Sequence, residues 1–303
     1  MSYYHFSKFK GRVRPHDESM IISVKKRDEL IEYCEPFVRY KDDAYFDGLN
    51  IRLLTNIEHV HNFWSENWWP CIPSIVPHGV IYTIDDGGKL RPEEVYEREF
   101  ENPSANTIAV WNPETKTAFI LNTDYYGQTK PVALGMSADI LEEQGILSVH
   151  GASGAVDGRG YILIAPTNTG KTTHSYGPVI HHPRGEFHQD DWIYVHFVGD
   201  KTVGYASERR FYMRTNSIAN FPWLESIFRK SKLENVAPDD PIDKFLLSYP
   251  RVMIDPSFIV NPNKVVLNVR IHKTFLLKRD KKDKTIARSL DPEEAVEILK
   301  NAP

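Results

Sequence analysis

A turn-rich loop near the middle of the chain has the residue types needed to hold a phosphate group. The strand-like residues Ile162 to Ala165 lead into Pro-Thr-Asn-Thr, and Gly170, Lys171 and Thr172 follow directly. A glycine lets the backbone approach a ligand closely, a lysine supplies a mobile positive charge, and a threonine hydroxyl can bind Mg²⁺. The N–H groups at the start of a following helix would point at the phosphate oxygens. The pattern therefore predicts binding of a nucleotide phosphate.

The stretch 165–172 fits the Walker A pattern, except that Ala165 replaces the first glycine. The alternative is a strand-turn-helix joint that contains Gly-Lys-Thr by chance. The apolar strand before the loop and the expected helix after it favour a phosphate site. We expect the nucleotide to be bound by Thr167, Asn168, Thr169, Gly170, Lys171, Thr172 and Thr173.

Two adjacent carboxylates could supply the acid–base and metal chemistry that phosphoryl transfer needs. Asp190 and Asp191 follow a short strand downstream of the loop. One carboxylate beside a phosphate-bound Mg²⁺ can hold the metal, while the other takes the proton from an attacking hydroxyl. We expect Asp190 to be the base and Asp191 to be the metal partner, although the pair leaves the reverse assignment open. The alternative is a solvated Asp-Asp turn.

The elements that must position these groups alternate between strands and helices. Residues 146–166 and 185–197 each read as strand, turn, strand, and 170–180 reads as a short helix. Residues 263–280 predict two more strands. Asp291 before Pro and Glu predicts the N-terminus of a last helix. This part is expected to be an α/β nucleotide-binding domain with a mixed sheet, spanning 133–303.

The first part of the chain is expected to form a smaller α/β domain over residues 1–132. Apolar residues from Ile57 to Trp64 have helical spacing, 85–94 reads as a loop, and 107–121 reads as a β-hairpin. Residues 131–145 predict a helix that ends at Gly145. This domain would cover the site, shape the acceptor pocket or bind a partner.

Composition excludes several classes of protein. The 303 residues carry a formal net charge of -4, so no basic excess is present for general nucleic-acid binding. The two cysteines, Cys34 and Cys71, imply no disulfide framework. The first residues have no apolar core, so we do not expect them to be a signal peptide, and no apolar stretch is long enough to predict a membrane span. We expect a cytoplasmic protein without a membrane partner.

Three segments taken together resemble a known superfamily. They are Val149-His150-Gly151, the loop through Thr173-His174-Ser175, and Asp190-Asp191. In this order they are similar to the core of the HPr kinase/phosphorylase and phosphoenolpyruvate carboxykinase superfamily. The resemblance covers about residues 146 to 215, with weaker similarity to the end of the chain. It does not extend to the N-terminal part.

The resemblance implies roles at matched positions. Lys171 would neutralise the transferred charge, Thr172 would bind Mg²⁺, and His150 would lie near the phosphates. Glu208 loosely matches a carboxykinase segment and would be a second carboxylate on the metal side. Arg210, with Arg214 and Arg251 as further candidates, would clamp phosphate or an anionic acceptor. The alternative for His150 is a histidine of the protein core, or one that supports a site residue without touching the ligand. For Glu208, Arg210 and Arg214 the alternative is a charged strand edge that faces water.

The reaction these features predict is transfer of the γ-phosphoryl group of MgATP to a hydroxyl of a small-molecule acceptor. The segment that serves the protein substrate of HPr kinases is not found here, and neither is the Lys/His set of the carboxykinases. A protein serine kinase and a nucleotide-binding sensor with little turnover remain the alternatives. The acceptor, GTP or pyrophosphate as donor, and assembly as a homo-oligomer are left open. His181, His182 and His188 do not have the spacing of a zinc site.

Overall fold

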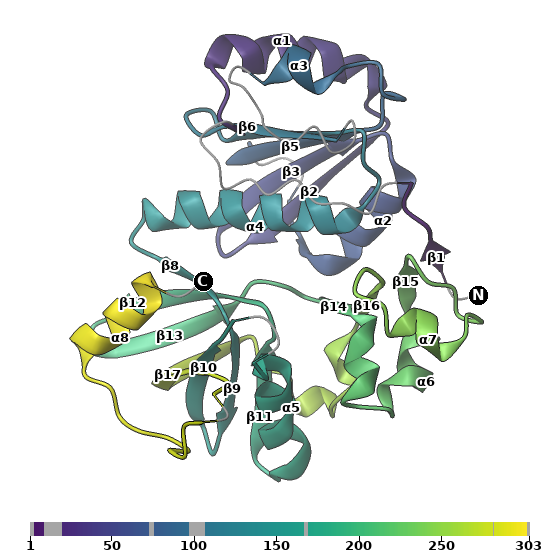
Figure 1. Cartoon of the computed structure of the whole chain (residues 1–303). Helices are drawn as coiled ribbons and strands as arrows, with labels where there is room; N and C mark the ends of the chain where they lie inside the picture. Colours follow the sequence, from purple (N-terminus) through teal and green to yellow (C-terminus); the bar gives the residue numbers. More distant parts are fainter. Residues whose placement is uncertain are drawn as a thin grey trace. The chain divides into compact units, whose positions relative to one another are not determined.

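The computed structural model describes residues 3–8, 20–72, 76–96, 107–166, 169–280 and 282–301. The chain forms two compact units, of which the first comprises residues 1–145 and 207–258 and the second 146–206 and 259–303. The expected boundary at residue 132 differs from this division, because it falls inside the helix α4 (Tyr126–Glu142). Residues 207–258, which were expected in the second domain, fold with the first unit. Figure 1 shows the elements of both units.

The main sheet of the first unit has the strand order β4-β2-β3-β5-β7-β6. Its central strands β3, β5 and β7 are parallel to one another, whereas β2, β4 and β6 pair antiparallel. Its strands are β2 (Tyr40–Phe46), β3 (Leu49–Thr55), β4 (Trp69–Pro70), β5 (Gly79–Ile84), β6 (Ile108–Asn112) and β7 (Thr117–Leu121). The expected hairpin at 107–121 is confirmed as β6 and β7.

Helices cover both faces of this sheet (Figure 1). On one face lie α1 (Val24–Cys34) and the short α3 (Pro92–Val95), and on the other lie α2 (Glu58–Asn67) and α4. Of the expected helical stripe, Val60, Phe63 and Trp64 are fully buried on α2, whereas Ile57 is the N-cap of the helix and is partly buried. Burial of this stripe against the sheet is what stabilises the helix.

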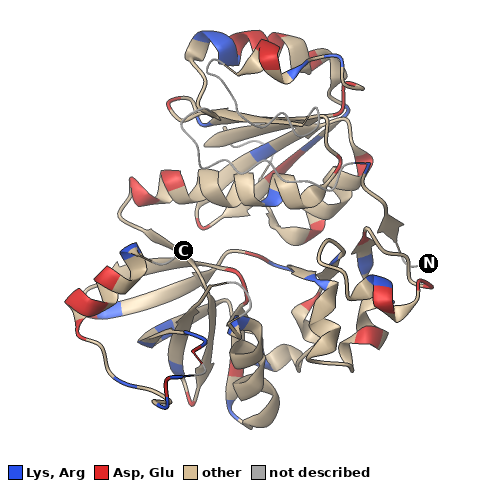
Figure 2. Cartoon of the chain, viewed as in Figure 1, with Lys and Arg blue, Asp and Glu red and all other residues tan. Residues whose placement is uncertain are grey.

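The helix α4 begins before the expected residue 131, and Pro131 lies inside it. Most of its length is buried, and Figure 2 shows it largely free of charge except at its carboxyl end. Acidic residues at that end oppose the helix dipole. Lys116 compensates, because its Nζ forms ion pairs with Asp139 and Glu143.

A second sheet of the first unit has the order β1-β15-β16-β14. Its strands are β1 (Tyr4–His5), β14 (Phe211–Arg214), β15 (Lys232–Glu234) and β16 (Arg251–Ile254), and its helices are α6 (Leu224–Phe228) and α7 (Ile242–Phe245). A short 3₁₀ turn at Thr215–Ala219 connects β14 to α6, and another at Pro256–Phe258 follows β16; a third, at Glu35–Phe37, lies between α1 and β2 of the main sheet. β1 pairs parallel to β15, so segments from the two ends of this unit's sequence share one sheet.

The sheet of the second unit has the order β11-β9-β10-β17-β13-β12-β8. Its strands are β8 (Leu147–His150), β9 (Ala152–Val156), β10 (Arg159–Ile164), β11 (Gly185–Gln189), β12 (Trp192–Val198), β13 (Lys201–Ala206) and β17 (Asn268–Leu276). β10 and β17 are parallel, and the other pairs are antiparallel. The unit is therefore mixed α/β, as expected.

This sheet curls so that its two sides approach. β8 is the last strand on one side and β9 is next to the last on the other, yet only Gly151 separates them in sequence. A β-carbon at Gly151 would lie 2.8 Å from the carbonyl oxygen of Leu163. Glycine is therefore required where the chain passes from one side of the sheet to the other.

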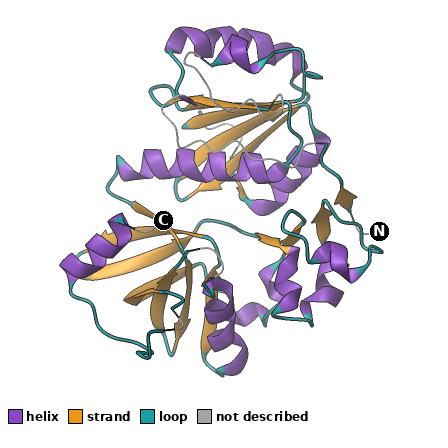
Figure 3. Cartoon of the chain, viewed as in Figure 1, coloured by secondary structure: helices purple, strands orange, loops and turns teal. Residues whose placement is uncertain are grey.

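Within the described residues, the second unit has two helices, α5 (Lys171–His181) and α8 (Pro292–Lys300) (Figure 3). α5 packs on β9, β10 and β11. Asp291 is the N-cap of α8, as expected, and its Oδ1 accepts a hydrogen bond of 2.8 Å from the N–H of Glu294.

Only one strand, β17, forms where the sequence predicted two over 263–280. A 3₁₀ turn at Pro262–Lys264 opens this segment. The next residues bond outside a regular strand, since the N–H of Val266 donates to the carbonyl of Phe187 and the carbonyl of Leu267 accepts from Ala206. The apolar run is therefore used to cross between β11 and β13. No helix within the described ranges is long and apolar enough to cross a membrane.

Candidate functional site

The predicted phosphate loop connects β10 to α5. Ile162 and Leu163 of β10 are buried, which fixes the strand that delivers the chain to the loop. Gly170 is the N-cap of α5 and has a φ of 105°, a left-handed conformation that favours glycine. The side chain of Thr169 donates to the carbonyl of Pro166 at 2.6 Å. Thr167 and Asn168, both predicted nucleotide ligands, lie outside the described residues.

Lys171, the first residue of α5, meets two other predicted site residues. Its Nζ lies 3.3 Å from Oδ1 of Asp191 and 3.3 Å from Nε2 of His150. His150 Nε2 is itself 3.1 Å from the same carboxylate oxygen. The lysine side chain is 17% exposed, whereas those of His150 and Asp191 are 60% and 42% exposed. The three groups therefore form a cluster that is open to solvent on the His150 and Asp191 side.

Strand register explains why these three residues meet. β8 and β12 pair so that His150 lies opposite Trp192, the residue after Asp191. The N–H of Gly151 donates to the carbonyl of Asp191 at 3.0 Å, which fixes the backbone of the acidic turn. Because α5 packs on β9 and β10, its first turn lies where the sheet curls back toward β8. The sequence predicted each residue separately, but their contact depends on this closure.

Asp190 faces a different part of α5. The single O–H of Ser175 is shared between two acceptors, Oδ1 of Asp190 at 3.3 Å and the carbonyl of Thr172 at 3.0 Å. Ser175 is fully buried, so the carboxylate is held against the first turns of the helix. Thr172 is half-buried and Thr173 is exposed. The two carboxylates of the acidic turn thus have separate partners.

Ser148 and Trp192 orient His150, and both were missed from the sequence. The indole Nε1–H of Trp192 donates to the Ser148 hydroxyl at 2.6 Å. The His150 ring stacks on the indole, with 5.6 Å between ring centroids and 23° between planes. The alternation of residues along β12 could have identified the face of the strand on which Trp192 lies, because it places Trp192 on the same face as Tyr194.

Glu208 and Arg210 lie in the first unit and not in this cluster. Glu208 is buried, and its Oε1 is 3.0 Å from Nζ of the buried Lys130 and 2.9 Å from Nδ2 of Asn67. Arg210 forms an ion pair with Glu66 and lies 3.8 Å from Asp255. The partners of both residues are long-range, and local sequence gave no sign of them.

Of the other anion-binding candidates, Arg251 is also in the first unit. It is buried, and its Nη1 donates to the carbonyls of Ser248 and Pro250. Arg214 is the exposed last residue of β14 in that unit. Neither belongs to the cluster around Lys171.

His188 has a structural position within the second unit. Its Nδ1 is 2.7 Å from the Ser153 hydroxyl and its Nε2 is 3.1 Å from the carbonyl of Leu267. Nε2–H therefore donates to the carbonyl and Nδ1 accepts from the serine, which keeps the ring neutral. Burial lowers the pKa of His188 to about 4. The described ranges contain no group of three or more His, Cys, Asp or Glu residues placed to hold a metal ion.

We expect His188 to make the stability of the second unit depend on pH. Its pKa is about 4 in the folded chain and near 6.5 in the unfolded chain. Between these values the unfolded chain binds more protons, so stability falls as pH falls, by about 3 kcal/mol in total. Urea unfolding at neutral pH and at about pH 4.5 should show this loss. The free energy of unfolding should depend less steeply on pH in His188→Gln than in the natural chain, and equally steeply in His181→Gln, an exposed control. An equal pH dependence in the natural chain and both variants would contradict this role of His188.

Comparison with known proteins gives only distant likenesses, all to solved structures. No protein-family model and no curated protein matches the chain. Among the solved structures that match is the Hpr(Ser) kinase/phosphatase from Coxiella burnetii. It is 15% identical, with a TM-score of 0.30, and the match covers 48% of this chain and 71% of that one. At this TM-score we base the proposed function on residues of this chain.

Proposed function

We propose that the chain is an ATP-dependent phosphotransferase whose second unit binds MgATP and transfers the γ-phosphoryl group to a hydroxyl of a small molecule. The observation that carries this proposal is the cluster of Lys171, His150 and Asp191 at the start of α5. A cation, a carboxylate and an imidazole meet there beside a helix N-terminus that begins with a left-handed glycine. That arrangement suits the binding of charged phosphates and the handling of a proton.

The residues of the loop would bind the triphosphate. The N–H groups of the first turn of α5 and the Nζ of Lys171 would face the β- and γ-phosphates. Lys171 would then exchange Asp191 for phosphate oxygens, because a dianionic phosphate attracts the ammonium group more strongly than one carboxylate. The tight turn at Gly170 leaves room for this approach, since a β-carbon there would meet nothing closer than 3.4 Å, at the His174 ring.

The donor set fits Mg²⁺ bound together with the nucleotide. Asp191 and the Thr172 hydroxyl offer hard oxygen ligands, and Mg²⁺ is usually held by one or two carboxylates plus substrate phosphates. Bound Mg²⁺ would supply neutralisation of the phosphate charge.

Asp190 is the proposed base. The Ser175 hydroxyl contacts one of its oxygens, and an acceptor hydroxyl would give its proton to this carboxylate. His150, oriented by Trp192, would keep Asp191 in place and lie near the phosphates. The base and the metal-side carboxylate therefore follow one another in sequence but contact different groups.

Lys171→Ala is the first test of nucleotide binding. MgATP should raise the melting temperature of the natural chain, because a ligand that binds only the folded state stabilises it. The variant should lose this increase, and its phosphoryl transfer should fall about 100-fold or more. Thermal shift and ³¹P NMR with pooled hydroxyl metabolites measure the two effects. Lys284→Ala, which changes an exposed loop lysine, should behave like the natural chain.

The outcomes separate the candidate functions. A new phosphomonoester signal that is lost in Lys171→Ala supports a small-molecule kinase. Stabilisation by MgATP without any new signal would replace the proposal with a protein kinase or a nucleotide sensor. No stabilisation by MgATP would contradict nucleotide binding at this loop.

A further inference from the structure

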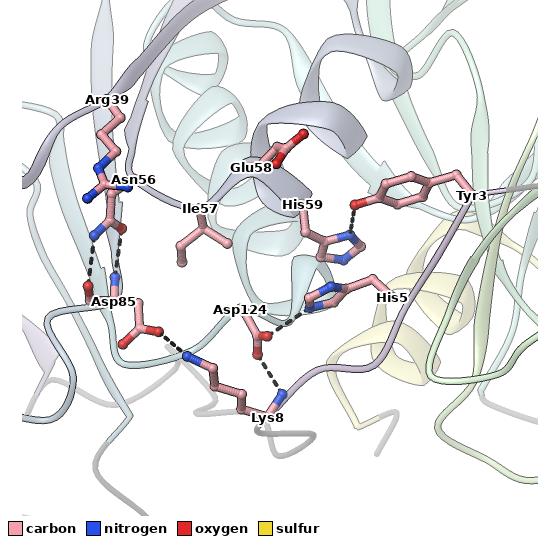
Figure 4. A pocket seen from close by; sticks show the side chains of 10 residues that line it. All are labelled: Tyr3, His5, Lys8, Arg39, Asn56, Ile57, Glu58, His59, Asp85 and Asp124. Carbon is pink, nitrogen blue, oxygen red and sulfur yellow. Dashed lines mark hydrogen bonds and ion pairs between the residues drawn. The ribbon is translucent and has the colours of Figure 1, made fainter.

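A pocket in the first unit lies at the carboxyl ends of parallel strands. It has a volume of about 380 Å³, within the range of pockets that bind small molecules. Asn56 follows β3, Asp85 follows β5, and Asp124 lies in the connection after β7; all three line the pocket. In open α/β sheets, ligands bind outside the carboxyl ends of the strands. We call this cavity the strand-end pocket (Figure 4).

Fixed hydrogen bonds shape most of its polar wall. Asn56 holds the backbone of Asp85 through two bonds, of 3.0 Å from the N–H and 2.7 Å to the carbonyl. Lys8 Nζ donates to the Asp85 carboxylate at 2.8 Å, and His5 Nε2 lies 2.8 Å from Oδ2 of Asp124. The backbone N–H of Lys8 donates to Oδ1 of the same Asp124. These polar groups already form hydrogen bonds and ion pairs with one another, so they define the shape of the pocket before any ligand enters.

Two other charged side chains that line the pocket do not take part in these interactions, and their charges have opposite signs. Arg39 and Glu58 line the pocket, yet neither forms an ion pair or side-chain hydrogen bond within the described part of the chain. Both are exposed. Figure 4 shows Arg39 on one side of the pocket, the stacked His5 and His59 on the other, and Ile57 with Glu58 between them.

We propose that the strand-end pocket binds a small zwitterion, namely a free α-amino acid. Arg39 would bind the carboxylate, for which its planar guanidinium is suited, and Glu58 would bind the ammonium group. Ile57 offers an apolar contact for the side chain of the ligand. A purely anionic ligand would face Glu58, Asp85 and Asp124, and a purely cationic one would leave Arg39 unused. This site is separate from the proposed phosphotransferase residues and goes beyond that function.

The test is calorimetric titration of the full chain with each proteinogenic amino acid. For any that binds, the matching amine without its carboxylate and the matching acid without its amino group are titrated too. The amino acid should bind with one site per chain, and each truncated analogue should bind at least about tenfold more weakly. Arg39→Gln and Glu58→Gln should each weaken the amino acid by about the same factor. Lys25→Gln and Glu32→Gln change exposed residues of α1 and should have no effect.

Three results would overturn the proposal: no amino acid binds, the acid or amine binds as tightly as the amino acid, or the pocket variants bind normally. The test does not depend on phosphoryl transfer. Lys171→Ala should retain amino-acid binding even though it loses the response to MgATP, so failure of one proposal leaves the other intact.

Discussion

Replacing Asp190 with Asn should lower kcat for phosphoryl transfer by about 1000-fold while nucleotide binding is retained. An asparagine keeps the volume of the side chain and can still accept from the Ser175 hydroxyl, which now contacts Asp190 at 3.3 Å. It cannot accept a proton from the attacking hydroxyl. Because the change removes an interaction made in the transition state, kcat should fall and the dissociation constant for MgATP should stay within a few-fold. Single-turnover kinetics and calorimetry measure the two quantities.

Asp191→Asn provides the comparison that identifies the base. If Asp191 is a ligand of Mg²⁺, its replacement should raise the Mg²⁺ concentration needed for half-maximal rate, and excess Mg²⁺ should recover part of the rate. Asp190→Asn should show no such recovery. Asp200→Asn, at an exposed position after β12, is the matched control. It should leave kcat and the Mg²⁺ concentration for half-maximal rate unchanged. Recovery by Mg²⁺ in Asp190→Asn but not in Asp191→Asn would reverse the two roles.

Local pattern was enough to predict the elements around the phosphate loop. The strand at 159–164, the helix from Lys171 and the strands flanking the acidic turn all form where apolar periodicity and turn residues placed them. These signals depend on neighbours within a few residues, such as Gly170 at the helix N-cap. The capped C-terminal helix α8 and the hairpin β6–β7 were predictable for the same reason.

Features that depend on distant parts of the chain could not be predicted. Residues 207–258 return to the first unit, and the reason lies in pairing of β1 with β15 and in contacts such as that between Glu234 and His59. Nothing in the local sequence of either segment identifies the other. Glu208 and Arg210 were grouped with the Asp pair because they follow it in sequence, whereas their partners lie on α2 and α4.

In the candidate site, too, local sequence identified single residues but not the contacts that depend on distant segments. Lys171 and the Asp pair were found from residue type and spacing. The contact of Lys171 with His150, however, requires the sheet to curl until β8, which pairs with β12, lies near the first turn of α5. Ser175 lies in the segment that follows the phosphate loop, but the sequence gave it no role. Its hydrogen bond to Asp190 depends on the packing of α5 on the sheet. The strand-end pocket had no local motif, since its lining comes from five separate segments.

Glu234→Ala should destabilise the first unit by about 3 to 5 kcal/mol, the largest stability effect we expect from one substitution. Glu234 is fully buried at the end of β15. Its Oε1 lies 2.7 Å from His59 Nε2 and accepts from the N–H of Tyr126 at 2.8 Å, and its other oxygen accepts from the Tyr212 hydroxyl. Removing the carboxylate leaves these donors buried without an acceptor, and each such group costs about 1 to 3 kcal/mol.

The tryptophans allow this effect to be measured in one unit. Five of the six lie in the first unit, and Trp192 lies in the second. In a Trp192→Phe background, tryptophan fluorescence during urea unfolding therefore follows the first unit alone. Glu234→Gln should lose less stability than Glu234→Ala because its amide oxygen still accepts one donor, and Glu32→Ala on the exposed face of α1 should change stability by less than about 0.5 kcal/mol. If Glu234→Ala unfolds at the same urea concentration as Glu32→Ala, the carboxylate does not hold β15, α2 and α4 together. The return of residues 207–258 to the first unit would then depend on apolar packing instead.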